Sequence, residues 1–119
     1  MSKRDDRTFV EDMLARIALV DEFTKDGREA FMQTRMMQEA VIRGLEIIGE
    51  ASRNISDDVR AAHPEIAWRQ IAAFRNFVIH AYWDIKMERV WEVIQNELPT
   101  LKPQLEALLA SLPPEALDN

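Results

Sequence analysis

The chain of 119 residues contains no cysteine. This absence excludes disulfide bonds, iron–sulfur clusters, thiolate zinc sites and cysteine nucleophiles. Its three glycines form no Gly-rich phosphate-binding loop and no Gly-x-Ser-x-Gly nucleophile turn. No apolar run approaches the roughly 18 residues of a transmembrane helix, and no apolar segment of signal-peptide type follows the charged residues 1–7. We therefore expect a soluble, cytoplasmic protein without a membrane partner.

Basic residues are outnumbered, since 15 Lys and Arg stand against 21 Asp and Glu, for a formal net charge of −6. This balance argues against a protein that holds nucleic acid by a general basic surface. The acid excess lies at the two ends, because residues 28–89 carry equal numbers of acids and bases. Most of the cations are arginine, which suits two-pronged contacts to phosphate or carboxylate better than lysine does.

The remaining composition is typical of one globular domain, with 47% hydrophobic and 30% charged residues. That is too apolar for a disordered chain and too charged for a membrane span. A chain of this length can bury roughly two thirds of the surface that its unfolded form exposes, so one core can hold it. We predict a single domain over residues 1–119, of which 113–119 form a frayed tail.

Apolar residues recur every three or four positions along most of the chain, which predicts amphipathic helices and no strands. The first such stretch runs through Phe9, Met13, Ile17 and Val20. Asp26-Gly27 predicts its end, because glycine accepts the left-handed conformation that follows many helices. The next stretch predicts one long helix over about 28–55. Gly44 and Gly49 lie inside it, which we interpret as close approach of a neighbouring backbone.

Start and stop residues divide the rest of the chain into helices at about 56–63, 64–79, 84–98 and 101–112. Ser56 followed by two acids predicts a capped first turn. Pro64 suits the first turn of the next helix, and Asp84 is expected to cap the one after. Pro99 and Pro103 are expected to interrupt the helix there. The sequence therefore predicts an all-α bundle of four main helices with one or two short extra ones.

Metal sites common in helical bundles are not encoded. A di-iron bundle needs Glu-x-x-His pairs, but Arg60 stands three residues before His63 and Phe77 three before His80. No His-Glu-x-x-His helix is present either. Glu46 and Glu50 share a helix face, and we interpret them as exposed carboxylates. We predict no metal and no cofactor.

Four polar side chains interrupt the apolar segment 75–82, and they are Arg75, Asn76, His80 and Tyr82. On an ideal helix Asn76 and His80 lie one turn apart on one face, whereas Arg75 lies about 140° from His80. Histidine can transfer a proton near neutral pH, and arginine can bind a phosphate and stabilise the charge that builds on it. Cleavage of a phosphodiester needs such a pair.

Each of these side chains also has a structural interpretation, which the spacing alone leaves open. Arg75 could pair with an acid on another helix, and Asn76 could cap a helix. His80 could donate to a carbonyl group, and Tyr82 could place its ring at an interface with its hydroxyl in water. We interpret His63, directly before a proline, as a loop or helix-end residue.

The motif Arg-x4-His-x-Tyr, present as Arg75, His80 and Tyr82, resembles the signature of HEPN-domain toxins of the HepT type. The resemblance extends to the segments 40–51 and 63–69, to Val90-Trp91 and to Leu98-Pro99, and it covers about residues 8–110. One departure is Ala67, which stands before Trp68 where the family pattern has proline. That position touches a helix start and not the chemistry.

The resemblance implies a HEPN-type four-helix bundle that acts as a metal-independent endoribonuclease on RNA such as tRNA or mRNA. It implies the toxin of a type VII-like toxin–antitoxin pair, working as a homodimer whose motifs meet in a cleft between subunits. Arg75 and His80 would be catalytic, and Asn76 would support them. The antitoxin implied is a minimal nucleotidyltransferase that transfers AMP from ATP onto Tyr82.

Four further arginines are candidates for RNA-binding side chains that line such a cleft, namely Arg35, Arg43, Arg53 and Arg69. An alternative function is that of a non-catalytic helical subunit that binds a nucleotide or docks the nucleotidyltransferase. A purely structural helical dimer is the third interpretation. The sequence names neither the RNA nor the cleavage site.

Overall fold

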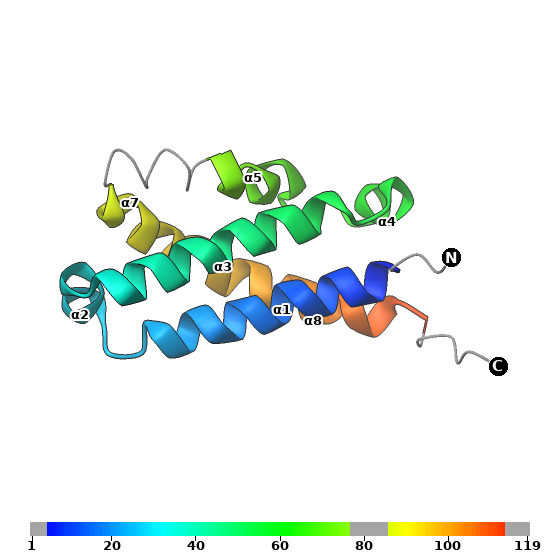
Figure 1. Cartoon of the computed structure of the whole chain (residues 1–119). Coiled ribbons are helices and arrows are strands. Elements are labelled where there is room, and N and C mark those ends of the chain that lie inside the picture. The colour runs from blue at the N-terminus through cyan, green and yellow to red at the C-terminus, as the bar shows by residue number, and fades with distance from the viewer. Residues whose placement is uncertain (1–4, 77–85, 114–119) are drawn as a thin grey trace.

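Three long helices form the centre of the fold in the computed structural model, which describes residues 5–76 and 86–113. They are α1 (Asp6–Phe23), α3 (Arg35–Arg53) and α8 (Leu98–Ser111). Helix α1 packs against both α3 and α8, and shorter helices cover the remaining side of α3 (Figure 1). Over the described ranges every regular element is helical, which confirms the predicted all-α bundle.

Helix α1 begins after the cap Asp5 and ends at Phe23, three residues before the predicted stop at Asp26-Gly27. Asp5 accepts hydrogen bonds from the backbone N–H and the hydroxyl of Thr8, at 3.0 and 2.9 Å. These bonds favour the ionised carboxylate and lower the pKa of Asp5 below its usual 3.8. At the other end Gly27 has a φ of +97°, which places the left-handed residue where the sequence predicts it.

The prediction of one long helix over residues 28–55 is wrong, because the chain breaks at Thr34. Thr34 has extended backbone angles (φ −119°, ψ 103°), and it separates α2 (Arg28–Gln33) from α3. The amide nitrogen of the Gln38 side chain donates to the carbonyl oxygens of Phe31 and Met32, both at 3.0 Å. These bonds satisfy carbonyl groups that the end of α2 leaves without helical donors, and so stabilise the break.

The short helix α4 (Asp57–Ala62) confirms Ser56 as its cap, because the Ser56 hydroxyl accepts from the backbone N–H of Val59. The expected restart at Pro64 is wrong, since α5 begins only at Trp68 and spans Trp68–Ala72. The indole N–H of Trp68 donates to the carbonyl oxygen of His63 at 3.0 Å. This bond holds residues 64–67 as a turn between the two helices.

The predicted interruption at Pro99 and Pro103 is also wrong. Helix α7 (Met87–Glu92) passes through a π-helical turn, η1 (Val93–Glu97), directly into α8, which contains Pro103. In the wider turn the N–H of Leu98 donates to the carbonyl oxygen of Val93, five residues back. Both prolines lie on the exposed side, where water can serve the carbonyl groups that lack an N–H partner. Asp84, the expected cap of this helix, lies outside the described residues.

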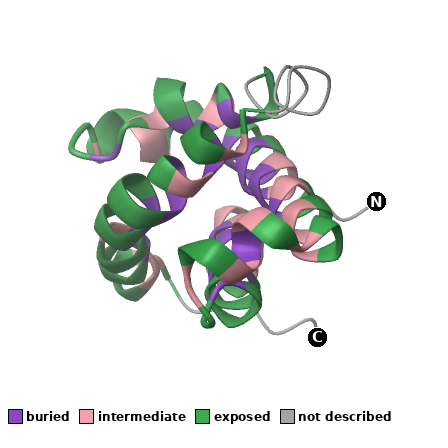
Figure 2. Cartoon of the chain, turned by 90° about the vertical axis from the view of Figure 1, so that its left-hand side faces the viewer, coloured by how far each residue is buried: buried purple, intermediate pink, exposed green. Residues whose placement is uncertain are grey.

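The buried residues lie on the inner faces of the long helices, which are purple in Figure 2. The core takes one stripe from each of them and adds Phe31, which stacks on the Trp91 ring at a centroid distance of 5.4 Å. The fully buried members with the largest side chains include Phe31, Met13, Ile17, Leu45, Ile48, Leu98, Leu105 and Leu108. This packing places α3 at the centre of the fold, and the candidate site lies beside it.

The two ends of the described chain are tied together. The guanidinium of Arg7 donates to the carbonyl oxygen of Pro113 at 3.1 Å, and to those of Leu109 and Leu112 at 3.4 Å. A cation at the carboxyl end of a helix bonds carbonyl groups that have no helical partner. A side chain in the first turn of α1 therefore caps the carboxyl end of α8.

Candidate active site

Arg75 follows α5 in a short helical stretch that continues to Asn76. Ile71 and Phe74, both 4% exposed, hold this stretch on the core. The side chains of the next residues point outward, and 45% of the Arg75 side chain is exposed. A buried phenylalanine thus anchors the segment whose following residue carries the predicted catalytic guanidinium.

Gly49 permits this segment to lie directly on α3. A Cβ atom at Gly49 would come within 3.0 Å of the Ile71 carbonyl oxygen and 3.3 Å of the Arg75 backbone nitrogen. The predicted close approach of a neighbouring backbone is therefore confirmed at Gly49. At Gly44 the neighbour is instead a side chain, because the added Cβ would lie 2.8 Å from Cγ2 of Val20.

The guanidinium of Arg75 pairs with Glu50, the residue that follows Gly49. Its Nη1 lies 3.4 Å from Oε2 of Glu50, whose side chain is 55% exposed. The ion pair with an acid on another helix, one of the two interpretations that the spacing leaves open for Arg75, is therefore present. Sequence reasoning did not find Glu50 as the partner, since the two residues are 25 positions apart and only their fold brings them together.

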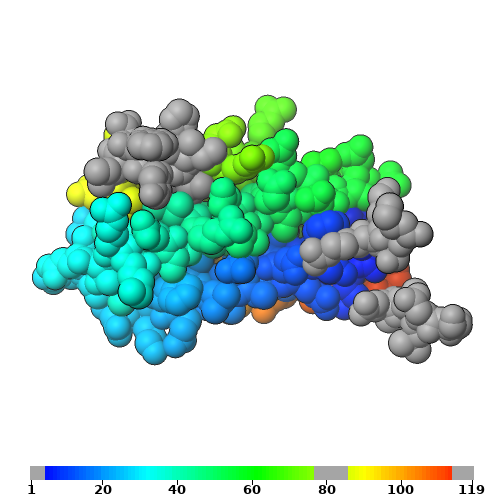
Figure 3. All heavy atoms as spheres, in the orientation of Figure 1, coloured from blue at the N-terminus to red at the C-terminus, as the bar shows by residue number. Residues whose placement is uncertain are grey.

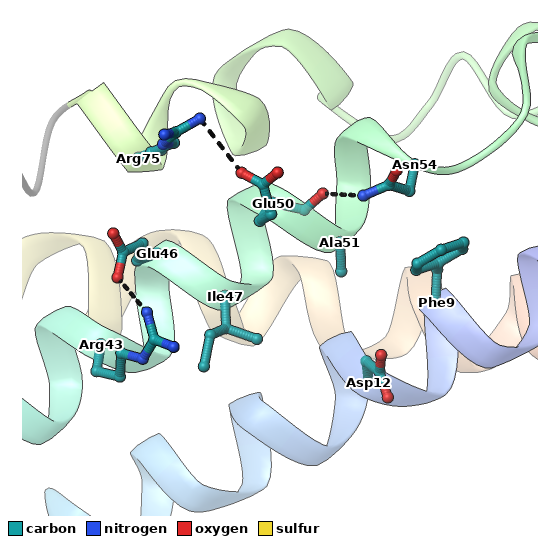
Figure 4. A pocket seen from close by; sticks show the side chains of 9 residues that line it. All are labelled: Phe9, Asp12, Arg43, Glu46, Ile47, Glu50, Ala51, Asn54 and Arg75. Atoms are coloured by element: carbon teal, nitrogen blue, oxygen red, sulfur yellow. Dashed lines mark hydrogen bonds and ion pairs between the residues drawn. The ribbon is translucent and has the colours of Figure 1, made fainter. Parts of the chain in front are cut away.

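A groove of about 390 Å³ opens beside this pair, between α1 and α3 (Figure 4). It lies on the face that Figure 3 shows, where atoms of α1 and α3 run side by side. Its lining residues are Phe9, Asp12, Arg43, Glu46, Ile47, Glu50, Ala51, Asn54 and Arg75. Two guanidinium groups and three carboxyl groups therefore face one space, and the groove of a single copy does not favour an anion by net charge.

Arg43 is the candidate RNA-binding residue that the fold brings into this groove together with Arg75. Its Nη1 lies 2.7 Å from Oε1 of Glu46, one turn before Glu50 on α3. Glu46 and Glu50 are indeed partly exposed carboxylates on one helix face, as predicted, and each pairs with a different arginine.

The other three candidate arginines do not line the groove. Arg35 lies at the start of α3, where its Nε is 3.6 Å from Oε1 of Glu39 and its side chain is 82% exposed. Arg53 is exposed in the last turn of α3, and Arg69 is exposed on α5. Asn76 is exposed at the end of the described segment. His80 and Tyr82 lie outside the described residues.

His63 ends α4, which confirms its interpretation as a helix-end residue. Its Nδ1 lies 3.1 Å from Oε2 of Glu65. The pKa of Glu65 is lowered, chiefly by a hydrogen bond from its own backbone N–H and then by the His63 ring. Neither residue lines the groove.

Comparison with known protein families identifies the family of this chain. The model of the ribonuclease HepT-like family matches residues 13–108, which include Arg75, His80 and Tyr82. The chain belongs to the HepT-like ribonuclease family. The family resemblance and the enzyme class predicted from the sequence are therefore confirmed.

Relatives of the HepT-like chain carry ribonuclease names. A protein of Thermococcus cleftensis named as a probable ribonuclease HepT is 42% identical over 107 residues, covering 89% of this chain and 97% of the relative. A protein of Methanocaldococcus jannaschii named as an RNase is 41% identical over 107 residues, covering 89% and 98%. Another from that organism, whose name joins gamma-glutamylcyclotransferase to RNase, is 32% identical over 92% of this chain and 50% of its own length. No solved structure matches the chain.

Two further properties of the HepT-like chain concern its described residues only. Within them no group of three or more His, Cys, Asp or Glu side chains could hold a metal ion. None of the helices found there is both long and apolar enough to span a membrane.

Proposed function

We propose that this HepT-like ribonuclease cleaves RNA internally and without a metal ion, through the pair Arg75 and His80. The observation that carries the proposal is the half-exposed guanidinium of Arg75 at the edge of a groove. Among the described residues its partner is Glu50, which contacts one of its nitrogens. A guanidinium has five N–H donors, so most of them stay available for a phosphate.

The chemistry follows from the two groups. The 2′-oxygen of a ribose attacks the adjacent phosphorus while His80 removes its proton, and Arg75 stabilises the negative charge that builds on the phosphorane oxygens. The bond from phosphorus to the 5′-oxygen of the next nucleotide then breaks, and that oxygen takes up a proton. The products are a 2′,3′-cyclic phosphate, which water can open to a 3′-phosphate, and a 5′-hydroxyl. Asn76, four positions before His80 in the sequence, supports the pair.

The reaction favours a homodimer. One copy offers one motif histidine, whereas two copies that share a cleft offer both a base and an acid. The groove of a second copy would bring the same two arginines and three carboxyl groups, so the benefit of the dimer lies in the second histidine and not in net charge. Arg43 is the first candidate to contact the RNA backbone there, and Arg35, Arg53 and Arg69 are candidates farther from the groove. Arginines act on phosphate within about one Debye length, ~8 Å at physiological salt, so the net charge of −6 does not prevent binding.

In this proposal the chain is the toxin of a toxin–antitoxin pair of the type VII-like kind. A minimal nucleotidyltransferase would transfer AMP from ATP onto the hydroxyl of Tyr82 and release pyrophosphate. The added phosphate would stand two residues from His80, where the phosphate of the RNA must lie, and would repel it. We take the RNase part as one domain of about residues 8–110, and its match to half of a relative with a two-part name supports this.

The direct test incubates purified protein with tRNA and with mRNA in the presence of a chelator. We expect fragments that end in cyclic or 3′-phosphate, and loss of cleavage in His80→Ala. Intact RNA after incubation with wild-type protein would contradict the nuclease. Binding of ATP or AMP in calorimetry without cleavage would favour the non-catalytic binding subunit instead.

A second experiment addresses regulation. Induced expression should arrest growth for wild type and not for His80→Ala. Intact mass is then measured after exposure to a candidate nucleotidyltransferase and ATP. A gain of whole AMP units that disappears in Tyr82→Phe supports the proposed modification, and a gain that persists in Tyr82→Phe contradicts it.

A further inference from the structure

The dipeptide Gly49-Glu50 meets both the backbone and the side chain of Arg75. Gly49 has no Cβ atom, and the Arg75 backbone nitrogen lies 3.3 Å from the position that such an atom would take. Glu50 then contacts Nη1 of the same arginine at 3.4 Å. The first observation concerns the backbone of Arg75 and the second its guanidinium, whose ion pair with Glu50 is drawn in Figure 4.

The last turns of α3 hold this dipeptide in place. The buried hydroxyl of Ser52 donates to the carbonyl oxygen of Gly49 at 2.7 Å. The side-chain amide of Asn54 donates to the carbonyl oxygen of Glu50 at 3.0 Å. Side chains as well as helical hydrogen bonds hold these carbonyl groups. The backbone of Glu50 is therefore restrained, which limits the positions that its carboxylate can take.

The ion pair is poorly placed to serve stability. Both side chains are about half exposed, with 45% for Arg75 and 55% for Glu50, and contact is made through one nitrogen only. Exposed pairs of this kind contribute little to folding because water screens them. They can still restrict the rotamers of a long side chain, and orientation of a reacting group has a large effect on turnover.

Resting on the function proposed above, we propose that Glu50 is a positioning residue, which holds the guanidinium of Arg75 toward the groove so that its free N–H groups meet the RNA phosphate. Glu50 touches neither the phosphorus nor the attacking oxygen in this role. The negative charge of Glu50 opposes binding of RNA. We therefore expect Glu50 to raise kcat and not to lower KM.

This role predicts that Glu50→Gln lowers kcat without raising KM. Loss of the carboxylate removes a charge that repels RNA, so KM falls or stays unchanged. The freed guanidinium samples more orientations, so kcat falls roughly 10- to 100-fold. A merely structural residue would lower both kcat and the melting temperature, and a merely repulsive carboxylate would lower KM without lowering kcat.

Glu46→Gln is the matched control. Glu46 lies one turn earlier on α3 and lines the same groove, but it pairs with Arg43 at 2.7 Å. Its change to glutamine removes the same charge from the same space and leaves the contact at Arg75 intact. We expect a lower KM with kcat within about twofold of wild type.

The experiment measures cleavage of labelled tRNA by the full-length wild type and both variants, together with thermal unfolding by circular dichroism. A loss of kcat in Glu50→Gln alone, with unchanged unfolding, supports the proposal. Equal kinetic behaviour of the two variants would overturn it. A loss of folding in Glu50→Gln would also overturn it, because the role would then be structural.

A second measurement separates this inference from the proposed function. Nitrogen-15 NMR of the arginine Nε–H groups reports the order of the Arg75 side chain without any substrate, after assignment with Arg75→Lys. We expect an ordered signal that becomes mobile in Glu50→Gln and not in Glu46→Gln. If wild type leaves tRNA intact, the nuclease proposal fails while this result still decides whether Glu50 positions Arg75. An unchanged signal would refute the positioning role.

Discussion

The two sides of α3 have different surroundings. The inner side presents Val41, Leu45 and Ile48, which are fully buried against the other long helices. The outer side presents Arg43, Glu46 and Glu50, whose side chains are partly exposed and form ion pairs. Burial of apolar area stabilises the fold by about 25 cal/mol per Å², whereas exposed ion pairs contribute little. One side of α3 therefore contributes to the core, and the other side lines the groove of the proposed site.

The largest expected effect on stability tests the inner side. Leu45→Ala leaves a cavity in the core and should lower the free energy of unfolding by about 2–5 kcal/mol. The matched change on the outer side is Ile47→Ala, which removes a half-buried side chain and should cost about 1 kcal/mol. Urea unfolding of both variants measures the difference. Equal losses would mean that the two sides of α3 contribute alike.

The largest expected effect on activity tests the outer segment. Arg75→Ala should lower kcat/KM about 10²- to 10³-fold, because a donor to the developing negative charge is lost. Its unfolding should be close to that of wild type, since the side chain is half exposed. Arg60→Ala removes an equal charge from α4 and serves as the control in the same cleavage assay. Comparable losses in both variants would point to net charge and not to position.

A third prediction compares the two glycines of α3. Gly49→Ala pushes on backbone atoms of Ile71 and Arg75, so it should lower both stability, by about 1–3 kcal/mol, and activity, by about tenfold. Gly44→Ala pushes on the Val20 side chain, which lies on α1 and away from the site, and should lower stability alone. Unfolding and tRNA cleavage are measured for both. Full activity of Gly49→Ala would show that the close approach does not position Arg75.

The smallest expected effect is a change in the melting temperature at low pH. The pKa of Asp5 is lower in the folded chain than its usual 3.8, so its contribution to stability is fully present above that value. As the pH falls through the lowered pKa, protonation removes the acceptor for Thr8 and the contribution is lost. Melting temperatures between about pH 5 and about pH 2 should fall less steeply for Asp5→Asn than for wild type. Parallel curves would contradict a role for this cap.

Local signals in the sequence account for much of the scaffold. The apolar period of α1, the cap at Ser56 and the turn at Gly27 each depend on neighbours a few residues away, and all three are confirmed. The break at Thr34 was missed because a side chain outside the turn, that of Gln38, stabilises it. Pro99 failed as a stop signal because the π-helical turn before it leads directly into α8, and Pro103 lies on the exposed side of α8 without ending it.

The site was only partly predictable for a different reason. Arg75 was singled out from its spacing to His80, and the match to the family model spans both residues. Its partner Glu50 was not found, since no local pattern links residues 25 positions apart. Periodicity also could not select Arg43 from the four candidate arginines, because which side of a helix faces a groove depends on the packing of its neighbours. The relation of Arg75 to His80 and Tyr82 stays a prediction.

The contact of Arg7 with the carbonyl group of Pro113 means that the described chain nearly closes on itself. The start of α1 and the end of α8 lie on the same side of the molecule, remote from α2 (Figure 1). A short linker could therefore join them, and new ends could be opened at Gly27, between α1 and α2. Such a circular permutant keeps every helix in place, which makes the order of the helices along the chain separable from their assembly.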